Sequence, residues 1–224
     1  MARLATSRRP ATTNTSGHPA LTALYKLGGQ GDPKTVESIY EQWAASYDSD
    51  ILADTHGYVG PQTAVRTLVR AGLARSSHIL DAGCGTGLVG VHLARAGYTA
   101  VDGIDLSPAM LKEAMKTGAY EALSIVDLTR AIPVPDAAYD GLTCVGTLTH
   151  GHVGPRVLSE FVRVVKPNGL IVATVLDDIW EDDGFETEAQ QLVKEHKVEI
   201  LSTDVEPYRP GAGVNAVTLV MRCC

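Results

Sequence analysis

Short apolar runs of strand length alternate with amphipathic segments of helix length through most of the chain. The strand-like runs are His78–Ala82, Thr99–Asp105, Ala122–Asp127, Tyr139–Val145 and Leu170–Val175. Apolar residues at three- and four-residue steps between them predict helices at Leu88–Ala96, Pro108–Lys116 and Val153–Val165. Strands that alternate with helices predict an α/β fold built on a doubly wound parallel sheet.

The pattern changes toward the C-terminus, where strands follow one another. Glu186–Lys194 has helical spacing, and the strand-like runs Val198–Val205 and Val214–Met221 flank the turn-rich segment Pro207–Gly213. Two such runs predict a hairpin, which we expect at the edge of the sheet. Lys166–Gly169 is predicted to be a turn, because Pro fixes φ and Asn-Gly tolerates positive φ.

The N-terminal region divides into a tail and a helical part. Residues 1–33 hold no Asp or Glu before Asp32 and are rich in Thr, Ser, Gly and Pro, which predicts a disordered tail or an organellar targeting peptide. Apolar residues from Val36 to Tyr47 share one helical face, and Pro61 opens a second helix that stops at Gly72. We expect one domain over 34–224, with helices over 34–75 and a core over 76–224.

Composition limits the classes of function. With 224 residues, 45% of them hydrophobic, the chain suits a single globular domain, and its net charge of -7 argues against a duplex nucleic acid as partner. Apolar runs stay far below the ~20 residues of a membrane helix. The 4 Cys form no C-x-x-C pair, so neither zinc nor disulfides are indicated. We expect a small-molecule partner, no bound metal and a cytoplasmic setting, with an organelle as the alternative.

A glycine-rich motif directly follows the first strand of the core. It reads Asp81-Ala-Gly83-Cys84-Gly85-Thr-Gly87 and leads straight into an amphipathic helix. Glycines at a strand-to-helix turn allow a ligand to lie against bare backbone. Cys84 is interpreted as a space-filling residue of the turn.

Further polar residues lie at the ends of the next strands. Asp105-Leu106 ends the second strand, twenty residues after Gly85, where a carboxylate can accept both hydroxyls of a ribose. Asp127-Leu128 ends the third strand. The fourth strand runs through Gly146 into a loop that carries His150 and His152. Because strand ends of such sheets border the ligand crevice, these residues are expected to meet.

This ordered set of motifs resembles the class I S-adenosylmethionine-dependent methyltransferases, from about Tyr40 to the C-terminus. The resemblance implies a Rossmann-like sheet of about seven strands with the last strand antiparallel. It also implies that Asp81, Gly83, Gly85 and Gly87 hold the methionine part of the cofactor and Asp105 its ribose. Asp127 and Leu128 would contact the adenine edge.

The stretch from Tyr40 to Asp48 is similar to the helix that covers the cofactor in the Williams-Beuren-region methyltransferase-like proteins and related small-molecule enzymes. The resemblance assigns Tyr40, Trp43 and Tyr47 to this cover. Cys84, Leu106 and Gly146 complete the expected contacts with the cofactor.

Other interpretations of the same residues stay open. Gly85-Thr-Gly87-Leu-Val-Gly90 also spells the G-x-G-x-x-G of a nicotinamide site, although no Tyr-x-x-x-Lys of a short-chain reductase is present. Asp105 could cap a helix and Asp127 could close a turn. The aromatic residues could belong to the core, and the histidines could be ordinary loop residues.

The predicted function is methyl transfer from S-adenosylmethionine to an oxygen, nitrogen or sulfur atom of a small molecule. His150 or His152 would remove a proton from the acceptor, since an unperturbed imidazole titrates near pH ~6.5. Alternatives are a catalytically idle S-adenosylmethionine-binding protein that docks to a partner, and an NAD(P)-dependent reductase. The sequence names neither the acceptor nor the oligomeric state.

Overall fold

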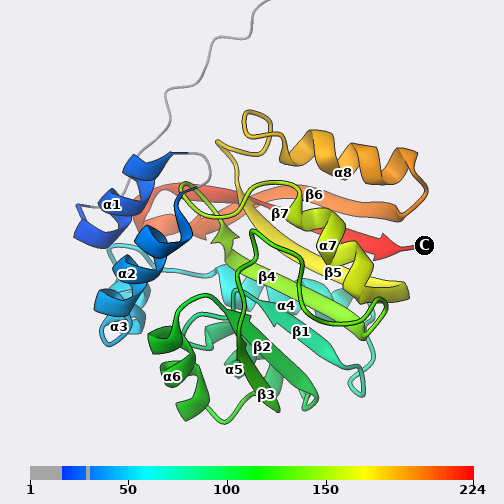
Figure 1. The fold of residues 1–224 in the computed structure, drawn as a ribbon, viewed down its shortest axis with the longest axis horizontal. Helices are drawn as coiled ribbons and strands as arrows, with labels where there is room; N and C mark the ends of the chain where they lie inside the picture. The colour runs from blue at the N-terminus through cyan, green and yellow to red at the C-terminus, as the bar shows by residue number, and fades with distance from the viewer. Residues whose placement is uncertain (1–16, 29–30) are drawn as a thin grey trace, which may run out of the picture.

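A mixed sheet of seven strands, in the order β3-β2-β1-β4-β5-β7-β6, runs through the computed structural model, which describes residues 17–28 and 31–224 (Figure 1). The first five strands pair in parallel, whereas β7 is antiparallel to both β5 and β6. This confirms the predicted Rossmann-like α/β class and the C-terminal hairpin. The strands are β1 (Ile79–Ala82), β2 (Val101–Asp105), β3 (Ala122–Ile125), β4 (Tyr139–Leu148), β5 (Val165–Leu176), β6 (Val198–Arg209) and β7 (Val214–Cys223).

Helices cover both faces of this sheet. They are α1 (Pro19–Leu27), α2 (Pro33–Trp43), α3 (Tyr47–Leu52), α4 (Gly60–Arg70), α5 (Leu88–Arg95), α6 (Pro108–Lys116), α7 (Val157–Val164) and α8 (Phe185–Lys194), with a 3-10 turn η1 (Pro210–Ala212). The crossovers through α5 and α6 lead toward β3, whereas the crossover through α7 leads from β4 toward the opposite edge. Because crossovers of this kind are right-handed, α7 lies on the face opposite α5 and α6.

The expected tail over residues 1–33 contains a helix where the structure describes it. In α1, Leu21 and Leu24 share a face, and both are buried against the core. The free energy gained by burying these leucines stabilises a helix in a segment whose composition predicted a disordered tail. Residues 1–16 and 29–30 lie outside the described residues, so the targeting hypothesis stays a prediction.

The aromatic segment from Tyr40 to Tyr47 is not one continuous helix. Asp32 begins α2 by accepting the Thr35 N–H at 3.0 Å, but this helix ends at Trp43 and α3 starts at Tyr47. The Trp43 indole N–H and the Ser46 hydroxyl both donate to Asp50, each at 2.8 Å, and these bonds hold the break. The rings nevertheless stay together, since the centroids of Trp43 and Tyr47 are 4.7 Å apart.

Two predicted turns are parts of strands. Lys166–Gly169 lies within β5 as an irregularity with Asn168 at φ 66, and the prediction that the strand begins only at Leu170, after a turn, was wrong. Pro207 and Arg209 pair with Asn215 and Val214, so β6 extends beyond its predicted end. This extension of β6 was not predicted because proline and glycine, which are frequent in this segment, indicate turns.

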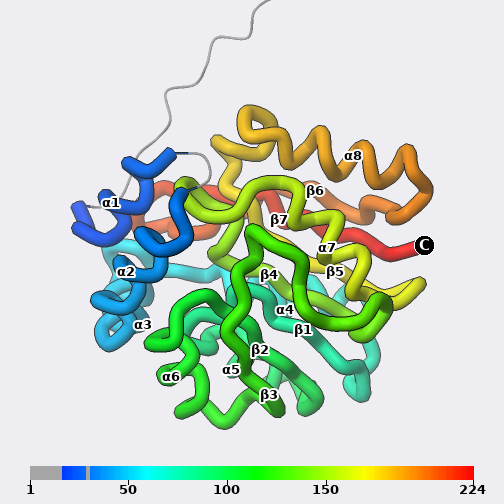
Figure 2. The backbone as a smooth tube through the Cα atoms, viewed as in Figure 1, coloured from blue at the N-terminus to red at the C-terminus, as the bar shows by residue number. Residues whose placement is uncertain are grey.

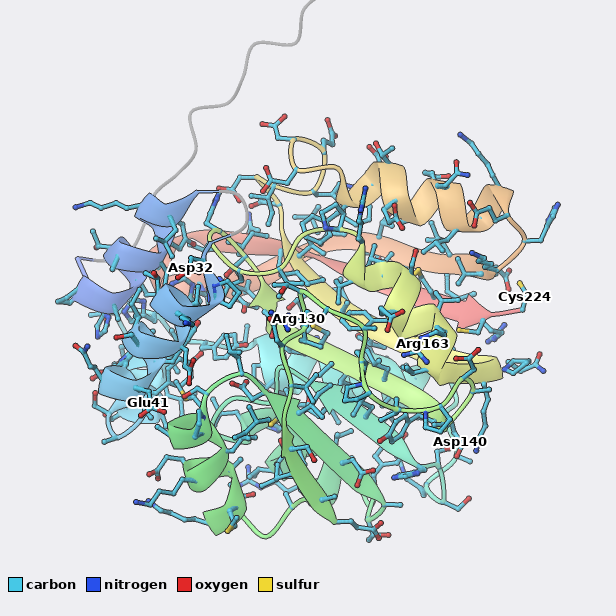
Figure 3. All side chains as sticks on the ribbon, in the orientation of Figure 1. Asp32, Glu41, Arg130, Asp140, Arg163 and Cys224 are labelled. Atoms are coloured by element: carbon cyan, nitrogen blue, oxygen red, sulfur yellow. The ribbon has the colours of Figure 1, made fainter. Side chains whose placement is uncertain are left out.

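The N-terminal helices lie beside the end of the β6–β7 hairpin, at the left in Figure 2. The Val59 N–H donates to the Tyr208 carbonyl and the Gly211 N–H donates to the His56 carbonyl, both at 3.1 Å. On the other side, Glu41 extends from α2 and accepts the Ala109 N–H at the start of α6, at 3.0 Å (Figure 3). The helical cover is therefore fixed to both halves of the sheet.

Tyr120, just before β3, packs so closely against the glycine-rich motif that some of its positions have no room for a side chain. Its hydroxyl accepts the Gly90 N–H at 3.1 Å, and a Cβ atom at Gly90 would overlap its ring. A Cβ at Gly87 would lie 3.2 Å from the ring, and one at Gly103 would lie 3.0 Å from it. The G-x-G-x-x-G spacing is thus explained in part by the space that one tyrosine fills.

Substitution of Gly90 by Ala tests this packing. Ala normally stabilises a helix relative to Gly, by about 1 kcal/mol. Here we expect Gly90→Ala to lower the free energy of unfolding by about 1–3 kcal/mol, because the ring must move. Urea unfolding measures the change. In a Tyr120→Leu background the same substitution should be nearly neutral or stabilising, and an equal loss in both backgrounds would contradict the assignment.

Candidate active site

A large cleft, here called the main cleft, opens beyond the carboxyl ends of β1 and β4, where the order of the strands reverses. It encloses about 890 Å³ of space free of protein atoms, part of it open to solvent. Ligand sites of α/β sheets occupy this position. Of the predicted residues, its walls contain Tyr40, Tyr47, Gly83, Cys84, Gly85, Asp105, Leu106, Leu128, Gly146 and His152.

The glycine corner presents backbone to the main cleft. Gly83 and Gly85 have φ values of +74 and +54, and a Cβ atom at Gly83 would overlap the Thr147 hydroxyl. A Cβ at Gly85 would meet no protein atom within 4 Å, so this residue borders open space. The corner can therefore approach a ligand closely through its main chain.

Asp105 joins the glycine corner to the end of β2. Its carboxylate accepts the Gly85 N–H and the Ser107 N–H, each at 2.9 Å, and burial raises its pKa. The helix cap of α6 is Ser107, whose hydroxyl accepts the Met110 N–H at 3.3 Å. Asp105 is thus not needed as a cap, and its half-buried carboxylate borders the main cleft.

Asp81 and Gly87 lie outside the walls of the main cleft. Asp81 is fully buried below the corner, where it accepts the Tyr120 hydroxyl at 2.7 Å and the Thr143 hydroxyl at 2.9 Å. Burial raises its pKa to about 7. Gly87 packs near Tyr120 and Thr117. Contrary to the expectation of direct contact with a ligand, both support the corner from beneath.

Asp127 also departs from its expected position. It accepts the backbone N–H and the hydroxyl of Thr129, at 2.9 and 2.6 Å, and pairs with the exposed Arg130 at 3.4 Å (Figure 3). It closes a turn, and the cleft wall is formed by Leu128 and Thr129 instead. The alternative interpretation of Asp127 as a turn residue describes this arrangement.

The predicted histidines differ in position. His150 binds Asp178 at 2.9 Å and lies outside the walls of the main cleft, so the structure does not bring it to the expected site. His152 lies in the wall and is buried, which lowers its pKa to about 4. Its Nδ1–H donates to the His150 carbonyl at 2.8 Å, so Nε2 accepts the Tyr40 hydroxyl at 2.8 Å.

A second cavity, here called the aromatic pocket, adjoins the main cleft. It comprises about 400 Å³ of space free of protein atoms, part of it open to solvent, and shares Tyr40, Tyr47, Tyr58, Gly146 and His152 with the cleft. Its remaining walls come from the N-terminal helices and β6, and include Trp43, Tyr25, Tyr208 and Arg209. Trp43 thus lines this pocket and not the main cleft.

Sequence analysis missed Tyr25, Tyr58, Tyr208 and Arg209. Tyr208 and Arg209 belong to the segment Pro207–Gly213, which was predicted to be turn-rich. Tyr25 belongs to the predicted tail. A register shift between Pro207 and Arg209 interrupts the alternation of β6, which allows consecutive residues to reach one pocket.

Among the described residues, one group of side chains has the spacing of metal ligands. The one trio there with ligand atoms within 4.8 Å of one another is His78, Asp102 and Glu121. It lies at the amino ends of the strands, away from the main cleft, and His78 is bound to Asp102 at 2.9 Å. The expectation of no metal stays a prediction. Within the described ranges, no helix has the length and apolar character to cross a membrane.

Comparisons with known proteins agree with this geometry. A family model described as "Methyltransferase domain" matches residues 80–173, which hold the glycine corner, Asp105 and Gly146. Over these residues the chain is similar to methyltransferase domains. It is 38% identical over 138 residues to "Methyltransferase-like protein 27" of Homo sapiens, a match that covers 60% of this chain and 55% of that protein.

Other methyltransferases match over longer stretches at lower identity. "Malonyl-[acyl-carrier protein] O-methyltransferase" of Pseudescherichia vulneris is 28% identical, over 83% of this chain and 73% of its own. The solved "TehB-like SAM-dependent methyltransferase" of Corynebacterium glutamicum superposes with a TM-score of 0.60 at 21% identity, over 84% of this chain and 99% of its own. The chain spans about half the length of most of the curated relatives that it matches.

The residues of the main cleft fit S-adenosylmethionine, the cofactor that the similarity to methyltransferases implies. Asp105 already accepts backbone N–H groups, and each carboxylate oxygen retains a lone pair that can accept a ribose hydroxyl. The bare backbone at Gly85 leaves room beside it. Asp105 and Glu37 are the acidic residues in the described cleft wall, which has no Lys or Arg, and this suits a ligand that carries a sulfonium.

The buried carboxyl of Asp81 predicts a particular pH dependence of stability. Its folded pKa of about 7 lies above the ordinary value of 3.8, so the folded state holds a proton that the unfolded state releases between these values. Stability is therefore lost as pH rises from about 4 to 7. Asp81→Asn, which cannot ionise, should gain about 3 kcal/mol of stability relative to the native protein as pH rises from 5 to 8.

Urea unfolding at both pH values measures this difference. Asp140→Asn is the comparison variant, because the pKa of this carboxyl is lowered by its bonds to Lys166 and His78. It should show no gain at high pH. A gain of the Asp81→Asn protein that does not change with pH would contradict the assignment.

Proposed function

We propose that this protein transfers a methyl group from S-adenosylmethionine to a small molecule. The observation that carries the proposal is the continuity of the two cavities. The main cleft, with Asp105 and the glycine corner, meets the aromatic pocket at Tyr40, Gly146 and His152. A donor in the cleft and an acceptor in the pocket would therefore face each other across shared residues.

The bound cofactor supplies a methyl group on a positively charged sulfur, ready for in-line displacement. The residues of the chain then have to bind, align and exclude water. Asp105 and the backbone of Gly85 orient the donor from one side. Tyr40 of α2 and Tyr47 of α3 cover the donor from the opposite side. Gly146, which lines both cavities, has no side chain that would separate donor from acceptor.

His152 is the residue best placed to accept a proton from an acceptor. Because burial lowers its pKa to about 4, it is neutral at pH 7, with Nε2 directed at the Tyr40 hydroxyl. A proton from the acceptor would reach Nε2 either directly, once Tyr40 turns aside, or through that hydroxyl. An acceptor that is already ionised needs no such step.

The nature of the walls favours a small acceptor over nucleic acid. The net charge is -7, and the described part of the cleft wall offers no cation to a phosphate backbone. A nicotinamide reductase is disfavoured because Tyr120 packing explains part of the G-x-G-x-x-G spacing. A protein that binds the donor but transfers nothing remains the competing outcome, and production of S-adenosylhomocysteine from a pool of metabolites distinguishes it.

The first experiment tests the cofactor. Asp105→Ala removes the carboxylate that faces the ribose position, and we expect the affinity for S-adenosylhomocysteine to fall by about tenfold or more, since hydrogen bonds to charged groups contribute about 1.5–3 kcal/mol. Titration calorimetry measures the affinity and circular dichroism the fold. Asp127→Ala, whose carboxylate closes a turn outside the cleft, should bind within about threefold of the native protein. Equal affinity of all the folded proteins would refute the ribose assignment.

The second experiment follows the rate of transfer against pH once an acceptor is found. If His152 accepts the proton, the acid limb of kcat/KM should lie near pH 4 and not near 6.5, because the group titrates at its lowered pKa. Single-turnover rates between pH 4.5 and 8 should therefore stay nearly constant. His152→Asn should lower them by about 10²–10⁴-fold for an acceptor that must lose a proton. A half-maximal rate near pH 6.5 would assign the step to another group.

A further inference from the structure

The aromatic pocket contains a buried cation with free hydrogen-bond donors. Arg209 is 3% exposed, and its Nη2 donates to the Tyr25 hydroxyl at 2.6 Å. Its Nε and Nη1 are buried and have no acceptor within hydrogen-bond distance. Most of the donor capacity of this guanidinium is therefore unused by the protein itself.

No carboxylate of the described residues neutralises Arg209. None lies within 4.0 Å of its nitrogens, and the walls of the aromatic pocket contain neither Asp nor Glu. Asp178 is bound to His150. Glu206, on the same strand, pairs with Arg66 and accepts the Thr218 hydroxyl. The pocket thus carries a net positive charge.

A charge in this state is unfavourable for the folded protein. Burial of an ionised group without a partner opposes folding, whereas an apolar side chain of similar size fits the same space at no such penalty. The neighbouring rings do not replace a partner, since the guanidinium lies 5.9 Å from the centre of the Tyr25 ring and its free nitrogens lack acceptors. A binding role would account for a cation at this place.

We propose that Arg209 binds a carboxylate group of the methyl acceptor and that the apolar part of this acceptor packs against Tyr58 and Tyr208. This inference rests on the proposed function, because it places the acceptor in the pocket beside the donor. Arginine recognises carboxylates and phosphates through several directed hydrogen bonds. A single guanidinium between aromatic walls matches a monoanion better than a doubly charged phosphate.

The position of Arg209 separates this role from recognition of the donor. Arg209 borders the aromatic pocket and is absent from the walls of the main cleft, where Asp105 lies. The cavities therefore carry opposite charges. An anionic acceptor is attracted both by the guanidinium and by the sulfonium of the donor across the junction.

The test uses small aromatic carboxylates and their neutral amides as probes. The full chain is saturated with S-adenosylhomocysteine and titrated with benzoate and phenylacetate, then with benzamide and phenylacetamide, by calorimetry and ligand-observed NMR. We expect each carboxylate to bind at least tenfold more tightly than its amide. Arg209→Met should abolish this preference, and Arg209→Lys, which keeps the charge, should recover at least threefold of it.

Matched variants and a second readout separate binding from folding. Arg66→Met removes a half-exposed cation that pairs with Glu206 near the same strand, and should retain the preference for carboxylates. The thermal midpoint of Arg209→Met should equal or exceed that of the native protein, because a buried unpaired charge is removed. A structural role for Arg209 would instead lower the midpoint by several degrees in both Arg209 variants, without any preference for carboxylates in the native protein.

Each remaining outcome decides the proposal. No preference for carboxylates over amides in the loaded native protein would overturn it, as would tighter binding of phenyl phosphate than of benzoate. A tenfold loss of affinity for S-adenosylhomocysteine in Arg209→Met would assign the guanidinium to the donor instead. If the native protein binds no S-adenosylhomocysteine at all, the proposed function fails first, and that failure is recognised before any carboxylate is added.

Discussion

The hydrogen bonds of one buried carboxyl group fix the floor of the site. Asp81 lies on β1 and joins it to β4 through the Thr143 hydroxyl and to the segment before β3 through the Tyr120 hydroxyl. The strand order reverses between β1 and β4, so this link spans the position where the cleft opens. Tyr120 then fills the space against Gly90, Gly87 and Gly103, and sets how closely α5 approaches the sheet. The backbone at Gly83 and Gly85 can face a ligand because this layer holds it from below.

The two cavities differ in charge, and this difference organises the proposed chemistry. The main cleft has Asp105 and Glu37 in its wall, whereas the aromatic pocket has Arg209. A cationic donor and an anionic acceptor would each find the opposite charge in its own cavity, and their attraction would favour close approach at the junction. His152 and Tyr40 at this junction are uncharged at neutral pH, because burial lowers the pKa of the first and raises that of the second. Neither residue would therefore form an ion pair with an anionic acceptor in place of the cationic donor.

The sequence allowed the donor half of the site to be predicted better than the acceptor half. Asp105 and Gly85 could be placed near each other because the strand, the glycine turn and the next strand follow one another along the chain. The Gly85 N–H donates to the Asp105 carboxylate at 2.9 Å. The burial of Asp81 below the corner and the turn at Asp127 depend on side-chain packing that spacing alone does not encode. The contact between Tyr25 and Arg209 joins residues 184 positions apart, one in a predicted tail and one in a predicted turn. No short-range pattern marks such a pair.

This division follows the boundaries of the family match. Residues 80–173 contain the glycine corner, Asp105, Leu128 and Gly146, all of which line the main cleft. The aromatic pocket takes most of its walls from outside this range, from α1–α3 and from the end of β6. Hydrogen bonds join the hairpin to these segments, from Tyr208 and Gly211 to the chain before α4 and from Arg209 to Tyr25 of α1. A change in either segment can therefore alter the acceptor while the donor site is preserved, which is how one sheet can serve many methyl acceptors.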